Sequence, residues 1–421
     1  MTPPPAGAAG AGGPAGIDLD LRDLPAGALI GRYLLLGLRL DRHIDGLVDA
    51  YYGPPALASQ VAAEPPTDPA ALLAEAHDIR AALDDPTESG ALDPNRRRWL
   101  RAQVHGLATV AAKLGGAAVA YADEVEACYG VRPAPVPDDQ LAAAHRALAD
   151  ALPGSGPIAE RYPSWRESQA VPPDKLDEAI ASLADDFRDR TQTMFGLPDG
   201  EHIDFELVTN QPWSGFNYYL GDLRSRVAIN TDLPVLSTSL GHLVAHEAYP
   251  GHHTEHTRKE AGLVRRGRHL EETIFLVGTP QCLLAEGLAD LGLEVLVGER
   301  PEATIAEHLL PLGIPYDADV VAAVSTAGET LAAVRGNVAW MLHEDGRSVD
   351  DCIDYAVRWA LLPRARAEKM IEFLTDPVWR AYISCYIEGL PLCRRFVAGD
   401  PARFARLLTE QLIPADLAPA T

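Results

Sequence analysis

Apolar side chains recur every three to four positions over most of the chain, which is the spacing of amphipathic α-helices. This pattern predicts helices over residues 95–114, 138–152 and 173–195, each bounded by proline, glycine or acidic residues that favour helix ends. Segments with the two-residue period of β-strands are few and short. We therefore expect a mainly α fold with only a small amount of sheet.

One further helix is apolar on all sides and should be buried. A threonine–proline pair suits its N-cap and first turn, and leucine and valine dominate residues 281–297. Glu286 and Asp290 lie inside this run, although an unpaired buried carboxylate is strongly destabilising. Glu286 therefore needs a partner, either a metal ion or, at a helix crossing, an ion pair or a hydrogen bond to the acid. The neighbouring Gly287 would allow another helix to approach closely.

The segment Arg224–Asn230 alternates polar and apolar residues and is the best candidate for a short β-strand. Just before it, residues 211–219 hold four aromatic side chains, although aromatic residues make up only 6% of the chain. Such a concentration indicates either a substrate-binding wall or a packed core. The four residues are Trp213, Phe216, Tyr218 and Tyr219.

Composition narrows the choice of partners and compartment. With 36 basic and 60 acidic side chains, the formal net charge is −24, which disfavours nucleic acid and anionic membrane surfaces as partners. Five irregularly spaced cysteines without a C-x-x-C pair indicate reduced thiols. Because neither a signal peptide nor a membrane-spanning apolar run is evident, we expect a cytoplasmic protein.

Three regions follow from these patterns. Residues 1–16 are rich in proline, glycine and alanine and should form a disordered tail. Residues 17–200 form an N-terminal helical region, and residues 201–421 carry the candidate chemistry. We expect the last two regions to form one compact unit with two lobes. The sequence does not indicate an oligomeric state.

The most specific chemical signal is the octapeptide His-Glu-Ala-Tyr-Pro-Gly-His-His at residues 246–253. Zinc hydrolases commonly carry H-E-x-x-H on a helix, because two histidines four residues apart share one face and the glutamate can reach the reacting water. Here Pro250 occupies the position of the second histidine. The segment therefore either builds a metal site with another geometry or is the relic of one.

Two histidines compete for the role of second metal ligand. At about 100° per residue, His253 lies roughly 700° beyond His246 and nearly on the same face, whereas His252 lies roughly 600° beyond it. The intervening proline favours a kink, or a new helix with the proline in its first turn, so both histidines remain candidates. His242 and His256 stand at helical spacing from these residues, and we interpret them as solvated or capping side chains.

Four motifs in matching order give the C-terminal half a resemblance to the domain-of-unknown-function 885 family. The family hallmark H-E-x-x-P-G-H-H is matched at 246–253, and its upstream strand ending in Asn-Thr is matched at 224–231. Downstream, residues 285–289 resemble the E-G-x-A helix and residues 386–389 resemble the Y-x-x-G motif. This family looks like a distant relative of the glutamate-zincin metallopeptidases, including helical carboxypeptidases of the Taq type.

The resemblance implies a large helical metallopeptidase-like body with a small β hairpin or edge strand beside the active-site cleft. It also implies one zinc ion per chain, held by His246, by either His252 or His253, and by Glu286, with Glu247 as general base. The expected function is then zinc-dependent cleavage of peptide bonds, as a carboxypeptidase or an oligopeptidase. The alternative is a catalytically inert or non-peptidase binding protein in which the metal stabilises the fold.

Further candidate residues follow from the same resemblance. Tyr386 is the candidate donor to the charge that develops on the substrate carbonyl oxygen, because its helix is expected to lie against the cleft. Tyr382, one helical turn earlier, and Arg380 are candidates for substrate binding, although such a tyrosine pair also suits core packing. In the upstream strand the candidates are Arg226 and Asn230, because glutamate-zincins bind an extended peptide along an edge strand.

Overall fold

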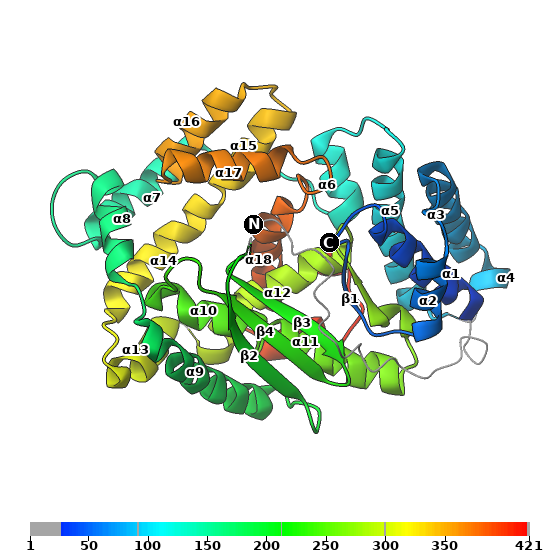
Figure 1. Ribbon diagram of the computed structural model, residues 1–421, viewed down its shortest axis with the longest axis horizontal. Helices are drawn as coiled ribbons and strands as arrows, with labels where there is room; N and C mark the ends of the chain where they lie inside the picture. The colour runs from blue at the N-terminus through cyan, green and yellow to red at the C-terminus, as the bar shows by residue number, and fades with distance from the viewer. Residues whose placement is uncertain (1–26, 91, 212, 299, 419–421) are drawn as a thin grey trace.

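The computed structural model describes residues 27–90, 92–211, 213–298 and 300–418. The predicted tail at 1–16 lies outside these described residues. Within them the chain is mainly helical, with a few short strands in two small sheets (Figure 1). The prediction of a mainly α fold is confirmed.

The N-terminal part of the chain is helical apart from one strand, and proline or aspartate begins several of its helices. Asp93, for example, accepts hydrogen bonds from the backbone N–H groups of Asn95 and Arg96, both at 3.0 Å, which satisfies two free donors of a helix start. The three helices predicted in this part are present, each to within one residue at either end. The elements are α1 (Gly27–Asp41), β1 (Val48–Tyr51), α2 (Pro55–Ala63), α3 (Pro69–Asp84), α4 (Pro86–Ser89), α5 (Pro94–Leu114), α6 (Tyr121–Tyr129), α7 (Asp138–Ala151), α8 (Ile158–Ser168) and α9 (Pro173–Met194).

The C-terminal part is built around α12 (Pro280–Val297), which is buried over most of its length, as its apolar sequence predicts. Gly287 of α12 meets Gly389 of α18 (Ile383–Val397), because a Cβ atom on Gly287 would stand 2.4 Å from the carbonyl oxygen of Gly389. The two helices therefore touch through their backbones. The other helices are α10 (Ser237–Glu247), α11 (His252–Lys259), α13 (Pro301–Leu309), α14 (Ala318–Ala332), α15 (Val334–His343), α16 (Val349–Trp359), α17 (Arg364–Thr375) and α19 (Pro401–Leu407), with short turns η2 (Glu260–Arg266), η3 (Leu270–Thr273), η4 (Leu310–Leu312) and η5 (Pro414–Asp416).

The strands form two sheets. In the larger, the order is β2–β4–β3, with β2 parallel and β3 antiparallel to β4. The expected hairpin is thus present as β3–β4, but the expectation that Arg224–Asn230 is an edge strand is wrong, because it is the central strand. The two edge strands of this sheet are β2 and β3. Of these, β3 packs against α10. The strands are β2 (His202–Val208), β3 (Gly215–Gly221), β4 (Arg224–Asn230) and β5 (Ile274–Leu276), which pairs with β1.

Two hydrophobic cores hold these elements together. The larger joins N-terminal helices, among them α1, α3 and α5, to the C-terminal helices α15–α19. The smaller joins α9, α10 and β4 to α13 and the start of α14. Helix α12 contributes to both cores and lies in the middle of the molecule (Figure 1). Among the described residues, no helix is long and apolar enough to cross a membrane.

Candidate metal centre

The octapeptide spans the end of one helix and the start of another. Helices α10 and α11 are separated by residues 248–251, so the helix break is confirmed, although α11 begins after Pro250 rather than with it in the first turn. At the corner, a Cβ atom on Gly251 would lie 1.9 Å from the carbonyl oxygen of His246, so only glycine fits. Pro250 packs against Gly292 of α12, where a Cβ atom would stand 3.0 Å from the proline ring. These contacts fix the direction in which α11 leaves the corner.

That direction brings His252, rather than His253, to His246 and Glu286. The two Nε2 atoms of His246 and His252 lie 3.1 Å apart. Oε2 of Glu286 lies 3.4 Å from Nε2 of His246 and 4.0 Å from Nε2 of His252. Zinc bonds of about 2.0–2.1 Å in a tetrahedron place ligand atoms about 3.3 Å apart. The three atoms therefore have the identity and spacing of a zinc ligand set.

Glu286 supplies the observation that tests this fit. Its Oε1 accepts a hydrogen bond from the hydroxyl of Tyr382 at 2.8 Å. Its Oε2 is buried and accepts no hydrogen bond from any residue that the structure describes. A buried carboxylate oxygen without a donor is costly unless a cation neutralises it. The oxygen that faces the two histidines is thus the one suited to a metal ion.

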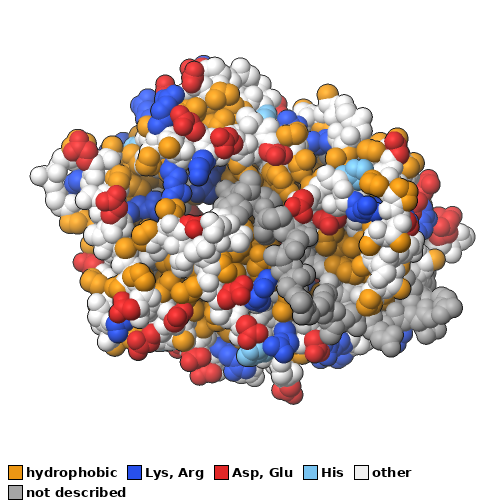
Figure 2. Space-filling model, in the orientation of Figure 1, with side chains coloured by type: hydrophobic (Ala, Val, Ile, Leu, Met, Phe, Trp, Pro, Cys, Tyr) orange, Lys and Arg blue, Asp and Glu red, His pale blue; other side chains and the backbone are white. Residues whose placement is uncertain are grey.

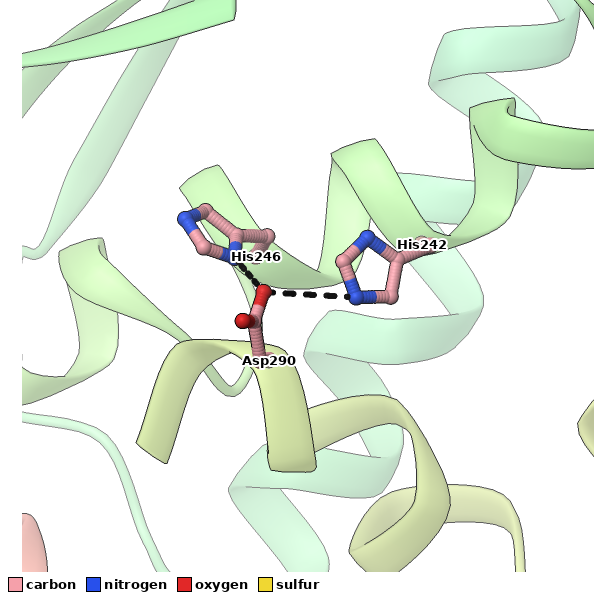
Figure 3. A group of neighbouring side chains, drawn as sticks. All are labelled: His242, His246 and Asp290. Carbon is pink, nitrogen blue, oxygen red and sulfur yellow. Dashed lines mark hydrogen bonds and ion pairs between the residues drawn. The ribbon is translucent and has the colours of Figure 1, made fainter. Parts of the chain in front are cut away.

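Asp290 orients His246 from behind. Nδ1 of His246 donates to Oδ1 of Asp290 at 2.9 Å (Figure 3). The other ring nitrogen, Nε2, is therefore the one that faces Glu286 and His252. A carboxylate bound to the second nitrogen is the usual support of a metal-binding histidine. Asp290 follows Glu286 by four residues on α12, so the two share one helix face. That spacing was readable in the sequence, although we did not assign Asp290 a role from it.

The two histidines differ in proton affinity. Burial disfavours the charged form of His246, but the hydrogen bond to Asp290 and the nearby carboxylate of Glu286 outweigh it and raise the pKa of His246 well above its usual value. Burial, with the charge of His246 beside it, lowers the pKa of His252 to about 4. His252 is therefore neutral near pH 7, with a lone pair that can bind a metal ion.

His242 lies beside His246 and Asp290, on their solvent side. Its Nε2 lies 3.5 Å from the same oxygen of Asp290, and 49% of its side-chain surface is exposed, in agreement with its interpretation as a solvated residue (Figure 3). His242, His246 and Asp290 are close enough to share a cation. His246 would then have to bind through Nδ1, which already donates to Asp290. We therefore assign Asp290 to the orientation of His246.

His253 points into a separate hydrogen-bond network. Its Nδ1 lies 2.8 Å from Oγ of Ser225, and its Nε2 lies 2.8 Å from Oε2 of Glu201. Glu201 also accepts hydrogen bonds from Tyr249 and Arg188. Burial alone would raise the pKa of Glu201, but these hydrogen bonds lower it to about 2. Both ring nitrogens of His253 have protein partners, and the structure does not bring this residue to the other candidate ligands.

Glu247 follows His246 but stands outside the three ligand atoms. Its carboxylate lies beside the start of β3, where a Cβ atom on Gly215 would be 3.4 Å from Oε1 of Glu247. Asn217 of β3 donates to the backbone carbonyl of Glu247 at 2.6 Å. Burial, reinforced by nearby carboxylates, raises the pKa of Glu247 to about 7. A carboxyl group with this pKa can both take up and release a proton near neutral pH.

The tyrosine pair lies beside Glu286, as expected, whereas Arg380 does not. The hydroxyl of Tyr386 lies 3.1 Å from that of Tyr382, which itself binds Glu286. Burial, reinforced by the charge of Glu286, raises the pKa of both tyrosines well above the usual value, so both hydroxyls stay protonated. The guanidinium of Arg380 is engaged by Glu124 at 2.7 Å and by a backbone carbonyl.

The two candidate substrate-binding residues of β4, Arg226 and Asn230, make contacts within the sheet and with the loop before β3. The guanidinium of Arg226 lies 4.4 Å from the ring centroid of Tyr218. Asn230 donates to the carbonyl oxygens of Gln211 and Trp213, both at 2.9 Å, and so braces the loop before β3. Asn230 thereby positions the strand next to Glu247.

The aromatic residues of this region divide between two surroundings. Trp213, Phe216 and Tyr218 pack against one another, and the last two are partly exposed. Tyr219 is buried, and its ring stacks on that of His256 with centroids 4.6 Å apart. The interpretation of His256 as a solvated or capping residue is therefore wrong. Its helix lies against β3, and its ring packs there in the interior.

Asp49 is a further acid near the site that sequence analysis missed. It is the extra residue of a β-bulge between β1 and β5, and such bulges redirect a side chain. Burial, reinforced by the charges of Glu286 and Glu247, raises the pKa of Asp49 to about 8. No motif signals this residue, because its position depends on a pairing with a strand more than 200 residues away.

Comparison with known proteins reveals the fold alone. No protein-family model matches the chain, and no curated protein matches it. The chain is similar to a crystal structure from Colwellia psychrerythraea described as a "putative lipoprotein", with a TM-score of 0.51 and 14% identity over 83% of this chain and 68% of that chain. A structure from Shewanella oneidensis, described in the same words and as of unknown function, gives a TM-score of 0.46 and 14% identity over 86% and 69%.

Proposed function

We propose that this protein is a zinc-dependent hydrolase that cleaves peptide bonds. The observation that carries the proposal is the convergence of His246, His252 and Glu286 on one point, with Glu247 next to His246 at the end of α10. These three residues would hold zinc through the two Nε2 atoms and Oε2. When bound, zinc would polarise the scissile carbonyl group and lower the pKa of water. The resemblance to the domain-of-unknown-function 885 family and to glutamate-zincins is a second support.

Glu247 would be the general base. It would accept a proton from the attacking water molecule and then deliver that proton to the nitrogen of the leaving amine. Tyr386, whose hydroxyl stays protonated and donates to the oxygen of Tyr382, would turn this donor to the carbonyl oxygen as negative charge develops there. Tyr382 would hold Glu286 in its orientation through the hydrogen bond to Oε1.

Strand β3 is the element best placed to bind an extended peptide. Because Ser214 accepts a hydrogen bond from the backbone of Asn230, alternation along the antiparallel pair turns the backbone groups of Gly215 and Asn217 away from β4. A peptide paired with these groups would pass beside Glu247. This arrangement favours a carboxypeptidase or an oligopeptidase. We assign the activity to the cytoplasm, because the five cysteines are free and buried.

The decisive experiment compares the wild type with Glu247→Gln on a mixed peptide pool, with bound zinc quantified in both proteins. We expect about one zinc ion per chain in each, and hydrolysis slower by a factor of about 10² to 10⁴ in the variant, which is the usual contribution of positioned proton transfer. Product masses reveal the direction of cleavage. Glu307→Gln, an exposed acid of α13, is the matched control.

Two outcomes contradict the proposal in different ways. Loss of zinc in Glu247→Gln would make Glu247 a ligand rather than a base. Zinc retention without hydrolysis by the wild type would favour the alternative of a metal-stabilised binding protein without peptidase activity.

A further inference from the structure

The two faces of the β2–β4–β3 sheet have different surroundings. On the outer face, Arg224 forms an ion pair with Asp204 at 3.3 Å, and Figure 2 shows acidic and basic side chains side by side over this part of the molecule. Because side chains alternate along a strand, Gly215 and Asn217 share the inner face, which packs against α10. Asn217 is polar, yet only 5% of its surface is exposed. Its side chain therefore serves a contact within the protein.

Asn217 fastens β3 to the end of α10. Its Nδ2 lies 2.6 Å from the backbone carbonyl oxygen of Glu247. Because a carbonyl oxygen can only accept a hydrogen bond, the amide must present its nitrogen there, which fixes the orientation of the side chain. Glu247 is the last residue of α10, where backbone carbonyl groups lack a partner within the helix. Asn217 supplies the donor for this carbonyl group.

Gly215, two residues earlier on β3, allows the same helix turn to come close. A Cβ atom on Gly215 would stand 2.7 Å from Cδ1 of Leu243 and 3.4 Å from Oε1 of Glu247. The last turn of α10 therefore packs directly on the strand, with the carboxylate of Glu247 beside it. A glycine that leaves room for the turn and an asparagine that binds it together set the position of Glu247 relative to β3.

A second buried asparagine shows what distinguishes Asn217. Asn337 is 4% exposed and accepts a hydrogen bond from the backbone N–H of Val136 at 2.7 Å. It also donates to the carbonyl oxygen of Val136 and to the hydroxyl of Tyr355, at 2.7 and 2.9 Å. Oδ1 of Asn217, by contrast, is buried and accepts no hydrogen bond from any residue that the structure describes. An unsatisfied buried acceptor is destabilising, so stability alone does not explain this amide.

We propose that Asn217 is a positioning residue that holds Glu247 in place as general base. The inference rests on the proposed function, because it concerns the residue that would take the proton from water. His246, which precedes Glu247, is oriented separately by Asp290. Asn217 should therefore act on the base and leave the metal ligands in place. Since β3 would also pair with the substrate, one strand would set the distance between the peptide and the base.

A double-mutant cycle tests whether Asn217 acts through Glu247, with a peptide from the mixed pool that the wild type cleaves. Asn217→Ala should lower kcat by about 10- to 100-fold, since a displacement of about 1 Å has effects of this size, while KM and zinc affinity change by a few-fold at most. In the Glu247→Gln protein the base is already lost, so adding Asn217→Ala should lower kcat by less than about threefold.

Two further variants separate the position of Glu247 from the stability of the fold. Asn217→Asp keeps the shape of the side chain but turns a carboxylate oxygen toward the carbonyl group of Glu247, so it should be at least as slow as Asn217→Ala. Asn337→Ala is the matched control, because it removes an equally buried amide whose partners belong neither to β3 nor to the candidate metal centre. It should unfold at a lower temperature and keep its kcat.

Hydrogen–deuterium exchange checks the contact without a peptide. The N–H groups of Ala248 and Gly251 donate to carbonyl oxygens in the last turns of α10, at 3.0 and 2.9 Å. Loss of the bond from Asn217 should loosen this helix end. Both amides should therefore exchange faster in Asn217→Ala than in the wild type, and at the wild-type rate in Asn337→Ala.

Three outcomes would overturn the positioning role while leaving the peptidase intact. They are equal slowing by Asn217→Ala in both backgrounds, equal slowing by the Asn337→Ala control, and loss of zinc from Asn217→Ala, which would make the residue a support of the whole metal centre. A wild type that cleaves no peptide would instead refute the proposed function, and the catalytic role of Asn217 with it.

Discussion

His252 and His253 are neighbours in the chain, yet their surroundings differ in kind. Both ring nitrogens of His253 are matched by Ser225 and Glu201 at 2.8 Å. The Nε2 atom of His252 instead faces another histidine nitrogen at 3.1 Å, and the carboxylate oxygen beside them accepts no hydrogen bond from the described residues. Both groups are largely enclosed by protein. The hydrogen-bonded surroundings of His253 are typical of a residue that stabilises the fold. The unsatisfied atoms around His252 are typical of a site that binds a ligand.

The largest expected effect separates the two histidines by metal affinity. Structural zinc sites contribute about 10–16 kcal/mol, so losing one of three protein ligands in His252→Ala should weaken zinc binding on the order of 10³-fold. His253→Ala should keep its zinc affinity within a few-fold while the protein unfolds at a lower temperature. Competition with a chelator of known affinity measures the first quantity, and calorimetry the second. The reverse pattern would assign the metal to His253.

Glu201 should make the stability that the His253 network contributes to the fold sensitive to acid. Its folded-state pKa of about 2 lies below the value of about 4.5 usual for an unfolded chain, so its contribution is complete above pH 4.5 and is lost as the pH falls toward 2. That contribution is on the order of 3 kcal/mol. Glu201→Gln should therefore be much less stable than the wild type at pH 7. Denaturant titrations at several pH values should show the difference shrinking below pH 4.5, and a constant difference would contradict the assignment.

A substitution at Asp290 should reduce zinc affinity less than the loss of His252. Asp290→Asn keeps the size of the side chain but removes the charge that orients His246, so zinc affinity should fall by about 10- to 100-fold. His242→Ala is the matched control, because His242 contacts the same carboxylate from the solvent side. A larger loss of zinc in the control than in Asp290→Asn would favour the group formed by His242, His246 and Asp290 as the binding site.

The smallest effects come from deleting one hydroxyl group from the His253 network and one from the candidate metal centre. Ser225→Ala should lower the free energy of unfolding by about 1 kcal/mol through the lost hydrogen bond to His253, and zinc affinity should not change. Tyr382→Phe leaves Oε1 of Glu286 without its donor and should weaken zinc binding by a few-fold. Paired measurements of stability and zinc affinity on both variants check the prediction. Equal effects on zinc would show that the two networks are coupled.

Sequence periodicity predicted the helices well because their apolar faces and end signals are local. The buried run at 281–297 became α12, and Glu286 was singled out because its burial required a partner. The order of the strands was not predictable in this way. The segment Arg224–Asn230 is central because β2 pairs with it in parallel, and nothing within the segment encodes that partner.

The choice between the two histidines was also beyond the sequence. It depends on the direction of α11, which is set by Gly251 at the corner and by contact of Pro250 with Gly292, 42 residues away in the chain. The contacts of Arg380 could not be predicted for a similar reason, since its acidic partner Glu124 lies on the distant α6.

The contact of Gly287 with Gly389 constrains how this protein can vary. Because the closest approach there is between main-chain atoms, no neighbouring side chain can shrink to accommodate a larger residue at either position. A methyl group at residue 287 would push α18 outward, and the distance between Glu286 and Tyr382 would grow with it. The distances within the candidate metal centre therefore depend on how far apart the axes of α12 and α18 lie. Homologues that keep the chemistry should keep both glycines, even where the surrounding core has been repacked.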